Sequence, residues 1–330
     1  MKALIYEGNN TLEFKETDTP VPNAGEVLVK VVSAGICGSD LHAFHGKDER
    51  RPAPLILGHE VSGFAEIDGE ERPVVVNPLV TCGTCPACLR GEDNLCPDRQ
   101  IISMAPRPGS FAEYFAMPTR NLITLPEGFD MRKAALCEPI ACGWHAVRLA
   151  ERSSGMKFED LNLIVCGAGA VGLGTALSAR ALGIQNIWVI ETQAGRRDNA
   201  KRQGFTVIDP SELGSIELPV IDAVIDAVGI APTRALASEK LRPGGTIVHI
   251  GLGSAVDGFD IRRATLQELK FIGSYTYTMK HFKEVVEAMV DDRFGALDWY
   301  QVEPVSEGQQ WFEKLSNNEV SAAKVLLEFS

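Results

Sequence analysis

The chain has 330 residues, 45% hydrophobic and 23% charged, which is typical of a soluble globular protein and long enough for two domains. Its net charge of −12 argues against DNA, RNA or an anionic membrane as partner, because phosphate binding needs a basic surface. No apolar run approaches the ~20 residues of a membrane span, and Glu7 interrupts the first apolar residues too early for a signal peptide, so we expect a cytoplasmic protein with reduced thiols.

Short runs of strand-forming residues dominate the first part of the chain. Residues 2–7, 11–16 and 27–32 have the composition of β-strands, and the turn PNAG precedes the third. Two further β-like runs, FAEI and PVVVNPLV, follow. This pattern predicts a β-rich domain of roughly 140 residues with long functional loops.

Isolated metal-type residues occur in three segments. Cys37 lies in AGICGSD, His59 and Glu60 lie in LILGHEVSG, and Glu138 lies far downstream in AALCEPIACGWHA. Each alone is more often a packing residue than a ligand. Together they offer the thiolate, imidazole and carboxylate that catalytic zinc uses, so they suggest a mixed-ligand metal site.

Four of the eight cysteines lie within fifteen residues, with the spacing Cys-x2-Cys-x2-Cys-x7-Cys. Disulfides are unfavourable where thiols stay reduced, and a redox pair would leave two cysteines without a purpose. Four thiolates on a loop with glycine and proline suit tetrahedral Zn²⁺. A zinc ribbon for nucleic acid conflicts with the acidic charge. We predict a structural zinc, without an open position, on Cys82, Cys85, Cys88 and Cys96.

From residue 161 on, predicted strands alternate with helical segments. LNLIVCG, NIWVIE, AVIDAVG and TIVHIGL have the character of short buried strands, and helical segments separate the first of them. This alternation predicts a parallel sheet with helices on both faces. The segment HFKEVVEAMVDD then predicts an amphipathic helix, and KVLLEF predicts a last strand.

The glycines of GAGAVG directly follow a predicted strand and begin a predicted helix. Gly167 permits a tight turn, Gly169 lets the backbone approach a pyrophosphate, and Gly172 allows close packing of helix and strand. The partial positive charge of the helix N-terminus favours phosphates. The alternative is a flexible turn without a ligand. We assign Gly167, Gly169, Val171 and Gly172 to cofactor binding.

Glu191 ends the next predicted strand, where an acid would bind an adenosine ribose. A carboxylate accepts from the 2′-hydroxyl of NAD and repels the 2′-phosphate of NADP. Arg196 and Arg197 are close in sequence and could serve the ribose or partly rescue a phosphate. We assign Glu191 and Arg196 to cofactor binding and favour NAD.

These residues resemble the zinc-dependent medium-chain alcohol dehydrogenase/reductase family, and within it the sorbitol, butanediol and threonine dehydrogenase branch. The resemblance covers nearly the whole chain. Its motifs are GICGSD, GHEVSG, the four-cysteine lobe, GSFAEYFAMP, Glu138 with Pro139, GAGAVG and AAKVLLEF. One departure is the segment between GHEVSG and the lobe, where the usual long hairpin is shortened.

The resemblance implies an α/β architecture with two parts. A β-rich GroES-like catalytic domain would comprise residues 1–141 and 276–330, with the zinc lobe at about 80–97. A Rossmann domain with a doubly wound parallel sheet, residues 142–275, would bind NAD. The family is also oligomeric, which implies a homodimer or homotetramer.

The resemblance also implies the metal ligands of a catalytic zinc. Cys37 and His59 would bind it, and Glu60 would be a direct ligand or a close acid. Glu138 stands where ethanol-oxidising relatives carry a cysteine ligand and polyol-oxidising relatives carry glutamate. Cys137, one position earlier, is a competing ligand.

Four further roles follow from the same resemblance. Ser39 would touch the substrate hydroxyl and pass its proton towards the cofactor ribose and His42. Asp40 would orient the imidazole of His59. Lys324 would approach the pyrophosphate.

We therefore expect an enzyme with two zinc ions per chain that transfers hydride from a secondary alcohol, a polyol or vicinal diol, to NAD. Alternatives within the family are threonine or a sugar phosphate as substrate. Other readings are a zinc-free quinone reductase on the same fold and a catalytically silent zinc protein.

Overall fold

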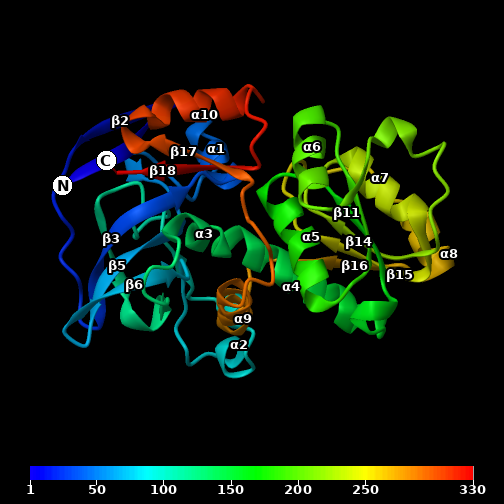
Figure 1. Ribbon diagram of the computed structural model, residues 1–330, viewed down its shortest axis with the longest axis horizontal. Helices are drawn as coiled ribbons and strands as arrows, with labels where there is room; N and C mark the ends of the chain where they lie inside the picture. Colours follow the sequence, from blue (N-terminus) through cyan, green and yellow to red (C-terminus); the bar gives the residue numbers. More distant parts are fainter. Residues whose placement is uncertain (330) are drawn as a thin grey trace. The chain divides into compact units, whose positions relative to one another are not determined.

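The computed structural model describes residues 1–329, which divide into two units (Figure 1). The first unit consists of Met1–Glu138, Thr278–Asp291 and the described residues from Leu297 on. The second consists of Pro139–Tyr277 and Asp292–Ala296. Each unit has its own sheets and its own hydrophobic core.

A seven-stranded sheet forms the centre of the first unit. Its order is β10-β6-β5-β3-β18-β17, and β9 also pairs with β3. The strands are β3 (Glu26–Gly35), β5 (Glu60–Ile67), β6 (Glu70–Val76), β9 (Tyr114–Pro118), β10 (Leu122–Thr124), β17 (Tyr300–Pro304) and β18 (Lys324–Glu328). The last strand of the chain, β18, runs antiparallel to β3, so both ends of the sequence contribute to one sheet.

Two smaller sheets and five helices complete this unit. The sheets are β2-β1-β4, made of β1 (Lys2–Gly8), β2 (Thr11–Glu16) and β4 (Leu55–Ile56), and the pair β7 (Leu79–Val80) with β8 (Gln100–Ile101). The helices are α1 (Gly38–Phe44), α2 (Pro86–Leu89), α3 (Met131–Ala135), α9 (Met279–Val290) and α10 (Gly308–Ser316).

The strands predicted in this part are present, with one difference. The run PVVVNPLV forms two strands, because β6 ends at Val76 and β7 begins at Leu79. Pro78 has no N–H for a ladder, and the side chain of Asn77 accepts the hydrogen bond of Leu79 N (3.0 Å). The sequence pattern therefore continues across a turn that interrupts the strand.

The second unit contains a six-stranded parallel sheet with the order β13-β12-β11-β14-β15-β16. The strands are β11 (Asn162–Cys166), β12 (Asn186–Ile190), β13 (Thr206–Ile208), β14 (Ile221–Asp226), β15 (Leu241–His249) and β16 (Lys270–Gly273). Numbered within the unit, this order is 3-2-1-4-5-6, the order of the Rossmann fold. The predicted doubly wound sheet is confirmed.

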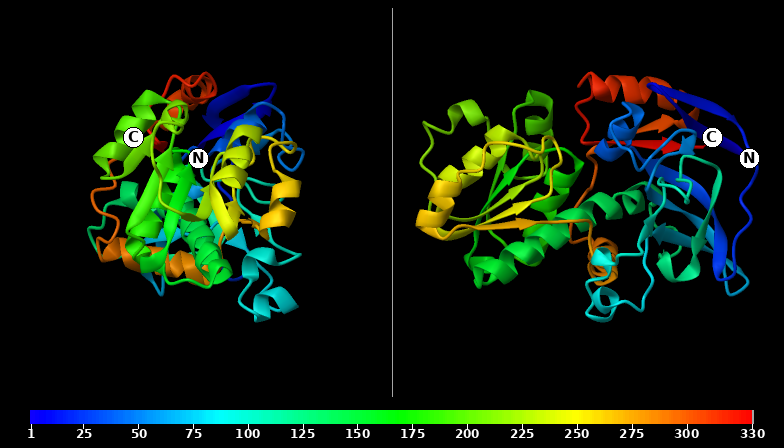
Figure 2. Two further views of the ribbon diagram at one scale, coloured as in Figure 1. Left: turned by 90° about the vertical axis from the view of Figure 1, so that its right-hand side faces the viewer. Right: turned by 180° about the vertical axis from the view of Figure 1, so that it is seen from behind.

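Helices cover both faces of this sheet (Figures 1 and 2). They are α5 (Ala170–Leu182), α6 (Ala194–Arg202), α7 (Ala231–Lys240) and α8 (Ile261–Gln267). Right-handed crossovers place α5 and α6 on one face, and α7 and α8 on the other. Helix α4 (Cys137–Ser154) begins in the first unit and continues into the second.

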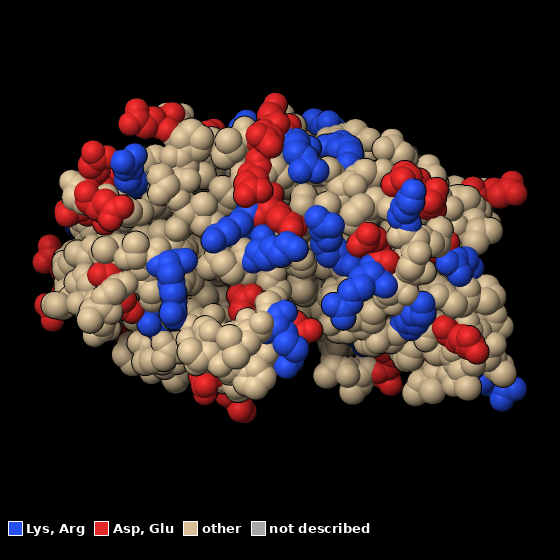
Figure 3. Space-filling view, turned by 90° about the horizontal axis from the view of Figure 1, so that it is seen from below, with Lys and Arg blue, Asp and Glu red and all other residues tan. Residues whose placement is uncertain are grey.

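Two surface properties bear on partners. No helix within residues 1–329 is long and apolar enough to cross a membrane. On the face that Figure 3 presents, acidic side chains lie among the basic ones, so this face offers no uninterrupted basic surface for a phosphate backbone.

Candidate metal centres and cofactor loop

Cys37, His59 and Glu60 come together in the first unit, where one ligand atom of each lies within 4.8 Å of the others. Cys37 directly precedes α1, and His59 and Glu60 stand at the start of β5. His59 and Glu60 are buried, and Cys37 is half-buried. Sulfur, nitrogen and oxygen donors in one group suit a catalytic zinc ion.

The Glu60 carboxylate is enclosed by β3 and β18. It pairs with Gly35 in the register of β3 and β5, and a Cβ at Gly35 would overlap Oε2 of Glu60. Oε1 accepts a hydrogen bond from Lys324 Nζ (2.6 Å), and Oε2 forms an ion pair with the same ammonium (2.6 Å) but makes no hydrogen bond among residues 1–329. A buried oxygen without a hydrogen bond is rare, and a metal ion would give this atom a further partner.

Lys324 is buried and charged. Burial lowers the pKa of its ammonium, but the electrostatic effects of Glu60 and Cys37 outweigh burial and raise that pKa above its usual value. Its Nζ also donates to the carbonyl of Ile36 (2.8 Å). These are the contacts of Lys324 in the structure, and its predicted approach to the pyrophosphate stays a prediction.

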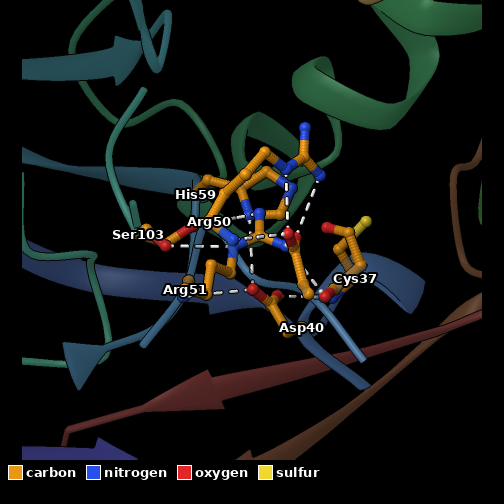
Figure 4. A network of polar contacts seen from close by, with 9 residues as sticks. Cys37, Asp40, Arg50, Arg51, His59 and Ser103 are labelled. Carbon is orange, nitrogen blue, oxygen red and sulfur yellow. Dashed lines mark hydrogen bonds and ion pairs between the residues drawn. The ribbon is translucent and has the colours of Figure 1, made fainter. Parts of the chain in front are cut away.

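The imidazole of His59 has two polar neighbours at the same ring nitrogen (Figure 4). Nδ1 lies 3.4 Å from Asp40 Oδ1 and 3.4 Å from Ser103 Oγ. Asp40 is itself fixed, because its carboxylate accepts from Cys37 N (3.0 Å) and Gly58 N (3.4 Å). With Nδ1 engaged in this way, Nε2 is the nitrogen available to a metal.

The charges around Asp40 keep it ionised. Burial raises the pKa of its carboxyl, but the nearby His59 and Arg51 lower that pKa by more than burial raises it. The pKa of Asp40 therefore lies below its usual value. The pKa of His59 is raised well above its usual value, because Asp40 and Cys37 outweigh the effect of burial. Asp40 therefore has both the contact and the charge that its predicted orienting role requires.

The remaining predicted residues of this site lie around the three-residue group. Glu138 is buried at the start of α4, outside the 4.8 Å group, and its charge helps to raise the pKa of Lys324. Cys137 is fully buried with Sγ 3.5 Å from Met289 Sδ, and burial raises the pKa of its thiol. A protonated, enclosed thiol is poorly suited to bind metal. Ser39 and His42 lie on α1, half-buried and exposed respectively.

The four clustered cysteines form a second candidate centre. The sulfurs of Cys82, Cys85, Cys88 and Cys96 lie within 4.8 Å of one another. Backbone N–H groups of Thr84 and Cys85 donate to Cys82 Sγ and lower its pKa to about 6. Burial and the neighbouring thiols raise the pKa of Cys88 to about 12. Four negatively charged thiolates this close together would repel one another, so a bound cation is needed for all four to be deprotonated at once.

The lobe is also tied to α9. The carboxylate of Asp93, which lies between Cys88 and Cys96 in sequence, accepts from Met279 N at the start of that helix (3.0 Å). A carboxylate at a helix N-terminus is favourable. The fold of the lobe therefore contributes to the stability of α9.

The glycine loop of the second unit has the geometry that a pyrophosphate site needs. Gly167 has φ +96°, a conformation that favours glycine, and a Cβ at Gly172 would overlap Gly167 O. Val171 lies in the first turn of α5. A Cβ at Gly169, just before α5, would meet only Arg196 Nη1 at 3.9 Å. Space for a ligand is therefore left at the start of the helix.

Glu191 connects the end of β12 to this loop. It is buried, and its carboxylate accepts from Ala168 N (2.8 Å) and Gln193 N (2.8 Å). The two neighbouring arginines differ. Arg197 pairs with Asp209 (2.9 Å) and donates to backbone carbonyls, whereas Arg196 Nε is buried without a hydrogen-bond partner among the described residues. Arg196 is therefore the arginine with a donor available to a ligand.

Two family models match the chain over the segments that carry these sites. Residues 23–127 match the alcohol dehydrogenase GroES-like domain, and residues 170–291 match the zinc-binding dehydrogenase model. L-galactonate-5-dehydrogenase of Escherichia coli (strain K12) is 33% identical over 312 residues, covering 90% of this chain and 89% of that protein. The chain belongs to the zinc-binding alcohol dehydrogenase family.

Two more relatives support this zinc-binding dehydrogenase assignment. D-xylulose reductase A of Aspergillus oryzae is 32% identical over 316 residues, covering 88% of this chain and 86% of the relative. A short chain alcohol dehydrogenase from E. coli CFT073, solved with NADH, is 27% identical with a TM-score of 0.89, covering 100% and 99% of the two chains. The predicted GroES-like and Rossmann architecture is confirmed.

Sequence reasoning missed three polar residues of this dehydrogenase. Ser103 Oγ lies near His59 Nδ1 and accepts from Arg51, but neither Ser103 nor Arg51 belongs to a recognisable motif. Asp226, at the end of β14, is fully buried and accepts from Val228 N (3.0 Å) and Gly229 N (2.8 Å). The sequence did contain a signal for Asp226, because an acid lies inside the strand-like run AVIDAVG. A carboxylate in a buried strand needs hydrogen-bond donors, and here the two backbone N–H groups supply them.

Proposed function

We propose that this protein is a zinc-dependent, NAD-dependent dehydrogenase that oxidises a secondary hydroxyl of a polyol or vicinal diol. The observation that carries the proposal is the group of Cys37, His59 and Glu60, in which one ligand atom of each residue lies within 4.8 Å of the others. The names of the relatives, L-galactonate-5-dehydrogenase and D-xylulose reductase, support a polyhydroxylated substrate.

In this proposal the first unit supplies the metal and the acid–base groups. Cys37, His59 and Glu60 hold the catalytic zinc, and Glu138 acts beside them. Zinc lowers the pKa of bound water from 15.7 to about 7, and a similar shift for an alcohol is worth on the order of 12 kcal/mol. A general base alone contributes roughly 3–5 kcal/mol.

The proton and the hydride leave the substrate by different routes. Ser39 accepts the hydroxyl proton and passes it towards His42, which is exposed to solvent on the same helix. NAD, when bound at the glycine loop, would accept the hydride. Lys324 also holds Glu60 in place, because its ammonium donates to that carboxylate and to Ile36 O.

The second unit supplies the cofactor site. Gly167, Gly169, Val171 and Gly172 form the pyrophosphate loop, and Glu191 accepts from the adenosine ribose. Arg196 lies beside Gly169 and serves the ribose edge. The carboxylate of Glu191 supports NAD over NADP, since it would repel a 2′-phosphate.

Domains, assembly and location complete the proposal. Residues 1–141 and 276–330 act as the catalytic domain, and residues 142–275 act as the NAD domain. A homodimer or homotetramer is supported by the edge strand β16, whose Phe271 is 43% exposed. None of the eight cysteines, which all lie among the described residues, forms a disulfide, and this supports a cytoplasmic location.

Metal analysis combined with activity tests this function. We expect two zinc ions per chain, and we expect NADH formation at 340 nm with polyols that stops when a chelator removes the catalytic zinc and resumes when zinc is restored. Activity that survives complete removal of zinc would favour a quinone reductase. A protein with two zinc ions that oxidises no member of a panel of polyols, diols, threonine and sugar phosphates would be catalytically silent.

A further inference from the structure

The guanidinium of Arg51 is buried next to the candidate zinc site. Its side chain is 1% exposed, and a buried charge is unfavourable unless it is paired and hydrogen-bonded. It pairs with Asp48 Oδ2 (3.1 Å), whose side chain is 8% exposed. The pair explains why the charge is tolerated. It does not explain where the other donors of Arg51 point.

Those other donors join two segments that are far apart in sequence. Nη1 donates to the carbonyl of Ser39 on α1 (2.8 Å). Nε donates to the carbonyl of Ser103 (3.0 Å), and Nη2 donates to Ser103 Oγ (3.4 Å). The planar guanidinium thus holds both segments in one fixed geometry.

Both segments bear on the same imidazole (Figure 4). Ser103 Oγ lies 3.4 Å from Nδ1 of His59, and Asp40, which follows Ser39 on α1, lies 3.4 Å from the same atom. A histidine that binds zinc through Nε2 carries a proton on Nδ1 and must donate it. Arg51 therefore binds the segments that carry both acceptors of that proton, because it donates to Ser103 itself and to Ser39, the residue before Asp40.

The backbone at Ser103 indicates that its position is imposed by its surroundings. Its φ of +70° lies in the left-handed region, which is unfavourable for a residue with a side chain. Ser103 is fully buried, and Arg51 binds both its carbonyl and its hydroxyl. Such conformations persist where neighbouring groups enforce them, often at functional sites.

The hydrogen-bond capacities are consistent at Ser103. A hydroxyl oxygen has two lone pairs. One accepts from Nη2 of Arg51, which leaves the other for Nδ1–H of His59. A lysine at position 51 would provide a point charge without the fork that reaches Ser39 and Ser103 together.

We propose that Arg51 is a positioning residue of the catalytic zinc site, acting on His59 through Ser103 and through the turn of α1 that carries Ser39 and Asp40. This inference rests on the proposed function, because it requires zinc at Cys37, His59 and Glu60. It adds two residues, Arg51 and Ser103, that touch neither metal nor substrate.

The test compares four variants with the wild type: Ser103→Ala, Arg51→Lys, Arg51→Met and the double variant Arg51→Met/Ser103→Ala. Arg50→Met is the matched control, since Arg50 also binds Asp48 but its side chain is exposed. Zinc affinity is measured by competition with a chelator. Co²⁺ then replaces zinc, because its charge-transfer absorption distinguishes the two sites. The site of Cys37, His59 and Glu60 has one thiolate ligand (the one-thiolate site), and the cysteine lobe has four (the four-thiolate site).

We expect zinc affinity at the one-thiolate site to fall about 10–100-fold in Ser103→Ala and in Arg51→Met. Arg51→Lys should not restore it, and the four-thiolate site and Arg50→Met should match the wild type. The loss in the double variant should be smaller than the product of the single losses, because Arg51 acts in part through Ser103. The Co²⁺ spectrum of the one-thiolate site should shift in both single variants.

The two proposals fail in different ways. A wild-type protein without zinc at the one-thiolate site contradicts the proposed function. A wild type with both zinc ions, and a Ser103→Ala variant with unchanged zinc affinity and an unchanged Co²⁺ spectrum, overturns only the role of Arg51. Ser103→Ala decides the matter alone if Arg51→Met does not fold.

Discussion

Lys324 and Glu60 form an ion pair in the interior of the first unit. Their charged groups lie 2.6 Å apart, and their side chains are 2% and 1% exposed. The pair joins β18 at the end of the chain to β5 beside Cys37. Buried charges are tolerated when further hydrogen bonds satisfy them, and Ile36 O accepts one from Lys324. The C-terminal strand is therefore part of the candidate metal site.

Removing the ammonium should destabilise the fold. We expect Lys324→Met to lower the free energy of unfolding by about 3–5 kcal/mol, because it leaves a buried carboxylate unpaired. Urea denaturation of the purified protein measures the change. Lys280→Met, at a site where the side chain is 80% exposed, is the control and should unfold like the wild type. A change below about 1 kcal/mol for Lys324→Met would show that the pair is not needed for stability.

The cysteine lobe should depend on its metal. We expect Cys88→Ser to retain one zinc ion per chain and to unfold at a lower temperature, because such a loop folds around its ion. Its activity should fall less than that of Cys37→Ser. Zinc analysis and thermal unfolding measure both effects, with Cys142→Ser as a control that should keep two zinc ions. A wild-type protein with a single zinc ion would refute the second site.

Cofactor preference should follow Glu191. Its carboxylate binds Ala168 N, so Glu191→Ala removes the ribose acceptor, removes the repulsion of a 2′-phosphate and loosens the glycine loop. We expect the ratio of kcat/KM for NAD⁺ to that for NADP⁺ to fall about tenfold or more. Glu217→Ala, at an exposed site of the same unit, should keep the wild-type ratio. A wild type that already prefers NADP⁺ would mean that Arg196 determines the preference.

An ion pair away from both sites predicts a pH dependence of stability. Arg107 Nη1 lies 2.8 Å from Glu26 Oε1. Burial raises the pKa of Glu26, but hydrogen bonds from Arg107 and Asn23 outweigh it, so the pKa lies below its usual value. A lowered carboxyl pKa gives stability that is present above the unfolded-state pKa and is lost as the pH falls through the folded-state pKa.

We therefore expect Arg107→Met to be less stable than the wild type by about 1 kcal/mol near neutral pH. The difference should stay constant down to about pH 4.3 and shrink below it. Urea denaturation across the acidic range measures it. Arg120→Met is the control, because Arg120 donates to the carbonyl of Thr81 and has no titrating partner there. A difference that grows as the pH falls would contradict the assignment.

Local patterns were sufficient to predict the second unit and the cysteine lobe. The strand–glycine–helix pattern at Gly167 predicts the first turn of the sheet, and alternation predicts β12, β14 and β15 but not the three-residue strand β13. Strand β16 was not predicted either, because three of its four residues are exposed and its pattern is not that of a buried strand. The lobe was predictable because all four sulfurs come from one short loop.

The support around His59 and Glu60 was not predictable in the same way. Lys324 and Glu60 are 264 positions apart, so their contact depends on β18 pairing with β3. Arg51 and Ser103 are 52 positions apart, and the left-handed backbone of Ser103 has no signature in the segment QIISMAP. A single sequence reveals residue types, but it does not reveal which distant carbonyl a buried guanidinium will reach.

We propose that the substrate class depends on Glu138. A carboxylate there, in place of a second thiolate, would leave zinc more Lewis-acidic and its coordination more adaptable, so that two neighbouring hydroxyls could be accommodated. The structure places Glu138 outside the 4.8 Å group, which suits a role through a held water or a shift towards the metal. Glu138→Gln keeps the shape and removes the charge.

The most direct measurement is kcat/KM with NAD⁺ for polyols and vicinal diols against ethanol and other primary alcohols, in the wild type and in Glu138→Gln. We expect the wild type to prefer the polyol or diol, and we expect the substitution to lower polyol oxidation more than any residual ethanol oxidation. A wild type that oxidises ethanol better, or a Glu138→Gln variant that oxidises polyols as well as the wild type does, would contradict this account.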